Sequence, residues 1–190
     1  SPAEHGLFAL YMRLISITSI VSTGKYELAV MIPSDRRDGA GLTKLAMVIA
    51  IFFSLFLFVL VLLLNRHLAM WLGNPEIRKW LYFVPLSTLL VGFFQASSYW
   101  SNRHKNYKRI ATANLSQSLF NSAVKLSTSK ALASGGGLIA GAIAEQLVGA
   151  FVYIRKMIKM EWSVFKTISR KDLQKIARRY SLFPRFNMIH

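Results

Sequence analysis

Three ionisable residues lie inside long apolar stretches and are the first candidates for chemistry. They are Arg13, Lys125 and Glu145, each flanked on both sides by uncharged residues. A charge that faces lipid costs about 2.5 to 3.5 kcal/mol on insertion scales, so we expect these side chains to face an interior. Lys125 lies near the end of its stretch, and its stem can alternatively reach the interface. Glu145 is shorter, so we expect it to pair with Lys125 or to be protonated.

Polar residues surround Lys125 at helical spacing. Asn114, Gln117, Asn121 and Lys125 follow one another at steps of three, four and four, which places them on one face of a helix. Such a face either lines a polar pathway or forms hydrogen bonds between helices, and the second use is the commoner one. The glycines at four-residue steps around Glu145, such as Gly149, let neighbouring helix backbones approach closely.

A second group of chemical interest is Lys25, Tyr26 and Glu27, at the end of the first apolar stretch. Tyr26 and Glu27 either interact with the basic residues at positions 36, 37 or 44 or belong to a plain solvated loop. The chain has no cysteine, which excludes disulfides, thiolate metal sites and a cysteine nucleophile. Its four histidines show no metal-ligand spacing. We therefore expect no metal and no cofactor.

The element that must position these residues is a membrane helix. Residues 45–64 contain no charge, and twenty residues at 1.5 Å rise span about 30 Å, the thickness of a bilayer core. A chain of 190 residues has little interior in which to bury such a helix on all sides. Together with 53% hydrophobic residues, this predicts an all-α polytopic membrane helix bundle. About five transmembrane helices are expected, near residues 6–24, 45–64, 81–100, 110–131 and 137–154.

The connections between these spans are expected to be charged or turn-forming. In the first loop, residues 25–44, Pro33, Gly39 and Gly41 are predicted to break any continuous helix. Residues 65–80 form a short polar connection with a turn at Gly73, Asn74 and Pro75. We therefore assign residues 1–154 to a transmembrane bundle.

The segment after residue 154 has a different character. Residues 155–180 hold nine Lys or Arg against Glu161 and Asp172, and apolar residues recur at helical spacing. We expect a basic amphipathic helix on the cytoplasmic membrane surface, or a connector that packs on protein instead. Ser169 to Asp172 has the pattern of a capping box. Residues 155–190 would also link to a second bundle outside this sequence.

The net charge of +16 would indicate nucleic acid in a soluble protein, but here the charge sits in loops. The loops on one side, residues 25–44, 103–109 and 155–190, carry 4, 4 and 10 Lys or Arg. The other side carries Arg66, Arg78, Lys79 and Lys130. By the positive-inside rule the first side is cytoplasmic, and nucleic acid is not an expected partner.

Four segments resemble a known family. They are SPAEHGLFALY at the start, TGKYELAVMIP after the first span, SYWSNRHKNYKRI between the third and fourth spans, and ARRYSLFPRF near the end. They resemble bacterial polysaccharide and O-antigen flippases of the multidrug, oligosaccharidyl-lipid and polysaccharide exporter superfamily. The chain would correspond to the second to sixth helices of a longer protein. Lys25 stands where the family usually has Arg, which keeps the charge but loses the bidentate fork.

The resemblance implies a transporter without enzymatic activity in the bacterial inner membrane. It would move an undecaprenyl-type lipid-linked glycan between the leaflets, with two helix bundles facing a central cavity. From their charge alone, and not from the resemblance, we expect Arg13 and Lys125 to attract the diphosphate of the lipid carrier, with Glu145 tuning this site and Asn114, Gln117 and Asn121 as further pathway candidates. The alternatives are a non-transporting membrane scaffold of a polysaccharide assembly complex or, less expected, a membrane-embedded glycan polymerase.

Overall fold

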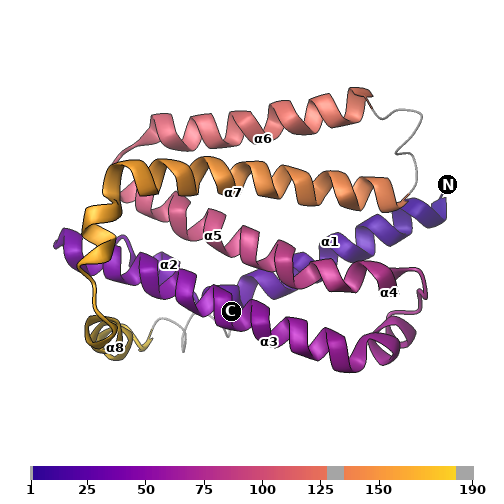
Figure 1. Cartoon of the computed structure of the whole chain (residues 1–190), viewed down its shortest axis with the longest axis horizontal. Coiled ribbons are helices and arrows are strands. Elements are labelled where there is room, and N and C mark those ends of the chain that lie inside the picture. The colour runs from indigo at the N-terminus through magenta and orange to yellow at the C-terminus, as the bar shows by residue number, and fades with distance from the viewer. Residues whose placement is uncertain (1, 128–134, 183–190) are drawn as a thin grey trace.

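The structure is a computed structural model that describes residues 2–127 and 135–182, without the side chains of residues 2, 3, 121–127, 135 and 160. Every regular element in this part of the chain is a helix, so the predicted all-α fold is confirmed. Figure 1 shows the long helices lying side by side as a bundle. The elements are α1 Pro2–Ser22, α2 Tyr26–Ala29, α3 Arg36–Trp71, α4 Ile77–Trp80, the 3₁₀ helix η1 Leu81–Phe83, α5 Val84–Arg103, α6 Tyr107–Ser127, α7 Gly135–Lys166 and α8 Arg170–Arg179.

The described residues contain four helices that are long and apolar enough to cross a membrane. These run over Glu4–Ser22, Arg36–Trp71, Ile77–Arg103 and Gly136–Lys159, and the chain is a multi-pass membrane protein. The predicted span near 110–131 does form a helix, α6, up to Ser127. Its described part is not among the four candidate spans. Its last predicted residues, 128–131, lie outside the described part.

Helix α3 is longer than predicted at both ends. It begins at Arg36, so the prediction that Gly39 and Gly41 break the helix is wrong. Both glycines are buried and make room for other side chains: a Cβ at Gly39 would lie 2.7 Å from Nε of Arg103 on α5. Helix α3 also continues to Trp71, which shortens the polar connection that we expected over residues 65–80.

The turn after α3 is where the sequence predicted it. Gly73 has a φ of +66°, a backbone conformation that favours glycine. Asn74 then accepts a 3.0 Å hydrogen bond from the backbone N–H of Glu76 through its side-chain Oδ1. Together they reverse the chain direction before α4 and α5.

Helix α5 packs against α1, α3 and α7, and polar pairs fix its position. The hydroxyls of Tyr11 and Ser87 lie 2.8 Å apart, and Ser54 on α3 donates a 2.7 Å hydrogen bond to the carbonyl oxygen of Pro85. Gly92 on α5 lies where α1 and α3 come close to this helix. A Cβ there would be 3.1 Å from both the Ala50 Cβ on α3 and the Ser22 Oγ on α1. Hydrogen bonds and small residues therefore hold the spans together, as is usual within lipid.

The segment after residue 154 differs from the expectation. Helix α7 continues without a break to Lys166, so no separate surface helix begins at Arg155. The second half is a separate helix, α8, and the predicted capping box at Ser169 and Asp172 is present. Its buried Ile176 packs against α3 at Gly41. Because α8 is basic and amphipathic yet packs on protein, the connector alternative describes it better than a helix lying on lipid.

Candidate functional site

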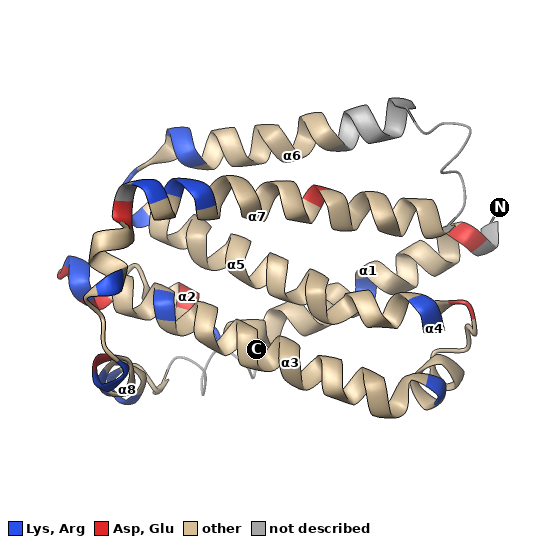
Figure 2. Cartoon of the chain, viewed as in Figure 1, with Lys and Arg blue, Asp and Glu red and all other residues tan. Residues whose placement is uncertain are grey.

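Basic residues gather at one end of the bundle, where α5 and α7 end and α3 and α6 begin (Figure 2). We call this the basic end. It carries the exposed arginines and lysines of α8. It also carries the arginines and lysines within residues 25–44 and 103–109. Among the described residues, the opposite end holds Arg66, Arg78 and Lys79.

A buried ion pair crosses from α6 to α7 at the basic end. Arg109 donates to both carboxylate oxygens of Glu161, from Nη1 to Oε2 at 3.2 Å and from Nη2 to Oε1 at 3.1 Å. The two side chains are 2% and 7% exposed. Such a two-pronged pair fixes orientation as well as distance, so it defines how the two helices meet.

Aromatic side chains enclose this ion pair. Trp100 at the end of α5 is fully buried and donates its indole N–H to Oε2 of Glu161. Its ring contacts Phe165 edge to face, with centroids 5.4 Å apart, and lies 4.2 Å from the His104 ring. The carboxylate of Glu161 thus joins α5, α6 and α7 in a dry site, where charge-assisted hydrogen bonds are strong.

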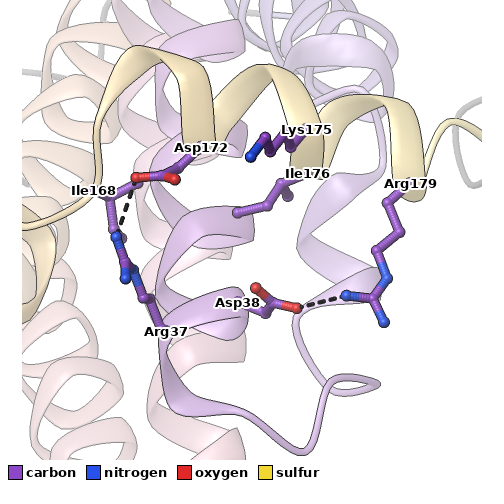
Figure 3. A pocket seen from close by; sticks show the side chains of 7 residues that line it. All are labelled: Arg37, Asp38, Ile168, Asp172, Lys175, Ile176 and Arg179. Atoms are coloured by element: carbon purple, nitrogen blue, oxygen red, sulfur yellow. Dashed lines mark hydrogen bonds and ion pairs between the residues drawn. The ribbon is translucent and has the colours of Figure 1, made fainter.

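Helix α8 is clasped onto the start of α3 by two exposed ion pairs on either side of a pocket of about 180 Å³ (Figure 3). Arg37 lies 3.3 Å from Asp172, and Arg179 lies 3.1 Å from Asp38. Ile176 points from α8 towards α3 between the two pairs. We call this arrangement the α8 clasp.

The capping box lowers the pKa of an acidic residue in the α8 clasp. The backbone N–H and the hydroxyl of Ser169 both donate to Asp172, and together with the nearby Arg37 they lower the pKa of that carboxyl below its ordinary value of 3.8. Asp172 is therefore ionised at neutral pH and available to Arg37. Asp172 lies in the first turn of α8, and the N-terminal end of a helix attracts negative charge.

Two cationic side chains at the basic end donate hydrogen bonds to backbone carbonyl oxygens of other segments. Lys44 on α3 donates to the carbonyl oxygens of Phe165 and Ile168, at 3.1 and 2.8 Å. Arg103 on α5 donates to those of Val30 and Asp35, at 2.7 and 3.0 Å. Because these carbonyls lie at or between helix ends, the cations satisfy acceptors that have no helical partner.

The structure separates the predicted pathway residues. Arg13 lies on an exposed face of α1, so no described helix encloses it as expected. Glu145 is half-buried on α7, and the side chain of Gln117 on α6 packs over Gly149 of the same helix. Asn114 is exposed on α6. The side chains of Asn121 and Lys125 lie outside the described residues, as does the predicted Lys125–Glu145 pair.

The group at Lys25, Tyr26 and Glu27 does not form a solvated loop. Glu27 is 4% exposed and accepts a 2.5 Å hydrogen bond from Thr23, rather than pairing with residues 36, 37 or 44. Tyr26 donates its hydroxyl to the carbonyl oxygen of Ala177, 3.2 Å away, and thus joins the α8 clasp. Burial raises the pKa of the Tyr26 hydroxyl above its ordinary value. Lys25 is half-buried at a positive φ of 59°.

Sequence reasoning missed the ion pair of Arg109 and Glu161. Arg109 was counted with a basic loop, and Glu161 with a surface helix. One signal was present: Glu161 is one of two acids in a segment with nine Lys or Arg, and it lies near Trp162 and Phe165. Nothing in the sequence showed that its partner would come from residue 109.

The described residues contain no group of three or more His, Cys, Asp or Glu side chains that could hold a metal ion. A family model described as "Polysaccharide biosynthesis protein" matches residues 1–182 of the 190-residue chain. Neither the curated proteins nor the solved structures compared with the chain give a match.

Proposed function

Because the chain belongs to the polysaccharide biosynthesis protein family, we propose that it is part of a transporter that flips lipid-linked oligosaccharide across the bacterial inner membrane. The family match over residues 1–182 is the observation that carries this proposal. It also favours a transporter without covalent chemistry over a membrane-embedded glycan polymerase.

The distribution of charge supports an orientation for the bundle. Lys and Arg are concentrated at the basic end, and the positive-inside rule assigns such an end to the cytoplasm. In this orientation α8 and its clasp lie on the side from which the lipid-linked glycan arrives. We further propose that helix α6 crosses the membrane beside α7, the helix that it contacts (Figure 1).

The exposed face of α1 supports a transport pathway. Arg13 shares this face with Ala9, Ser16 and Ile20, all exposed. A charge at this position facing lipid would cost about 2.5 to 3.5 kcal/mol, so the face meets water or protein in the working molecule. We propose that it borders the pathway between this bundle and a second one, as in transporters built from two repeats. Lys125, Glu145, Asn114, Gln117 and Asn121 are the other candidates for its lining.

The test is surface polysaccharide in a strain that depends on the native gene carrying this sequence. Arg13→Ala and Lys125→Ala should each lower flipping about tenfold or more, because each removes a charged hydrogen-bond donor for phosphate. Arg13→Lys should restore it in part, since Lys keeps the charge without the planar fork. Arg66→Ala, an exposed arginine at the opposite end, is the matched control.

Membrane levels of each variant must be equal for the comparison to hold. Normal polysaccharide in the Arg13→Ala, Lys125→Ala double variant would overturn the assignment of both residues. Loss of surface polysaccharide after deletion of the whole gene, together with normal polysaccharide in the double variant, would instead favour a membrane scaffold of the assembly complex.

A further inference from the structure

An apolar groove of about 400 Å³ opens between α3, α5 and α7 near the basic end. Its apolar lining includes Met47 on α3, Phe93 on α5, and Met157 and Trp162 on α7. Its charged lining residues are two lysines, Lys44 and Lys166. Among the described residues, none of the pathway candidates Arg13, Asn114, Gln117 and Glu145 lines it.

One of the two cations is fixed in place. The Lys44 ammonium donates to the carbonyl oxygens of Phe165 and Ile168, which uses two of its three donors. The third donor remains for a ligand. Lys166 is exposed at the end of α7, the helix that supplies most of the apolar lining. The two charges thus come from different helices and flank the same apolar surface.

The position of the groove indicates what it meets. It lies towards the basic end of the candidate spans of α3 and α7, and the positive charge of that end indicates that this depth is close to a membrane surface. Trp162 is 57% exposed, and an exposed indole at this depth is typical of the membrane interface. A ligand from this environment has an apolar chain for the groove and a polar group for the lysines.

We propose that this groove binds one phospholipid with a negatively charged head group from the leaflet at the basic end. An acyl chain lies along Met47, Phe93 and Met157, and the head-group phosphate meets Lys44 and Lys166. Charge complementarity selects an anionic lipid over a neutral one, since each lysine near the surface strengthens binding about fivefold. The assignment of this leaflet to the cytoplasmic side rests on the proposed function, but the binding itself does not.

Native mass spectrometry of the detergent-solubilised protein tests this proposal. Titration with phosphatidylglycerol and with phosphatidylcholine of the same acyl chains should show one phosphatidylglycerol retained at least tenfold more tightly. Lys166→Ala should weaken that lipid about fivefold and leave phosphatidylcholine unchanged. Trp162→Ala should weaken both lipids, because it removes apolar lining. Lys171→Ala, an exposed lysine of α8 outside the groove, is the matched control and should change neither.

Equal retention of the two lipids, or equal phosphatidylglycerol retention by Lys166→Ala and the unchanged protein, would overturn the proposal. So would displacement of phosphatidylglycerol by equimolar polyprenyl phosphate, which would assign the groove to the transported lipid instead. Both readouts are independent of flipping: loss of lipid binding with normal surface polysaccharide in the Lys166→Ala strain separates this site from the transport pathway.

Discussion

Arg109 and Glu161, fifty-two positions apart, meet through two parallel hydrogen bonds of 3.2 and 3.1 Å in a site that leaves them 2% and 7% exposed. Breaking a buried pair from one side leaves the other charge without compensation, which costs about 3 to 5 kcal/mol. Replacing both partners with apolar residues of similar size costs far less. We therefore expect a large loss of stability when one partner is replaced and a much smaller loss when both are replaced.

Glu161→Gln keeps the size of the side chain but removes the charge that Arg109 faces. We expect it to lower the stability of the solubilised protein by about 3 to 5 kcal/mol, seen as a lower midpoint in a denaturation series followed by circular dichroism. The Arg109→Met, Glu161→Leu double variant should recover most of this loss. Glu76→Gln, an exposed control, should stay within about 0.5 kcal/mol. A Glu161→Gln midpoint equal to that of the unchanged protein would refute the role of the pair.

The ion pair also shows a limit of prediction from the sequence: the spans were predictable, but their side-chain partners were not. The apolar stretches predicted the existence of the spans, because length and composition decide whether a helix fits a bilayer. Partner choice depends on how helices pack, which a hydropathy pattern does not contain. Glu161 was therefore assigned with its basic neighbours to a surface, although it is buried against Arg109 and Trp100.

The helix boundaries failed for a related reason. Gly39 and Gly41 are typical of a break, and no local pattern indicates that Arg103 and Ile176 occupy the space above them. The same limit applies to Arg155, which marked a change in charge but not the end of α7. By contrast, the capping box at Ser169 was predictable, because it depends only on residues three positions apart.

Gly92 offers a test of the close approach between α1, α3 and α5. A Cβ at this position would lie 3.1 Å from the Ala50 Cβ and 3.1 Å from the Ser22 Oγ, both short side chains that cannot swing aside. Gly92→Val should therefore lower stability by about 1 to 3 kcal/mol through overpacking. Gly6→Val on α1, where a Cβ meets nothing within 4 Å, is the control. Equal thermal denaturation midpoints for the two variants would contradict the packing described.

The α8 clasp should depend on pH through Asp172. Its pKa is lowered in the folded protein, chiefly by the backbone and hydroxyl of Ser169, so its contribution to docking is complete above the ordinary value of 3.8. This contribution is lost as the pH falls below that value and through the folded pKa. Protease cleavage between α7 and α8 should therefore rise at acid pH, measured with an acid-active protease. Asp172→Asn should be cleaved readily at every pH; an unchanged pH profile in this variant would assign the effect to another group.

Labelling of single cysteines tests the orientation, and the absence of native cysteine makes each introduced thiol the only one. Asn102 and Lys105 are exposed at the basic end, whereas Pro75 and Glu76 are exposed in the connection after α3. If the basic end is cytoplasmic, cysteines at the first two positions stay unlabelled by an impermeant reagent in intact cells and react once the membrane is permeabilised. Cysteines at the second two should react in both conditions. The reverse pattern would place α8 and its clasp outside the cell, where they could not meet a glycan carrier arriving from the cytoplasmic leaflet, and the proposed direction of transport would fall with the orientation.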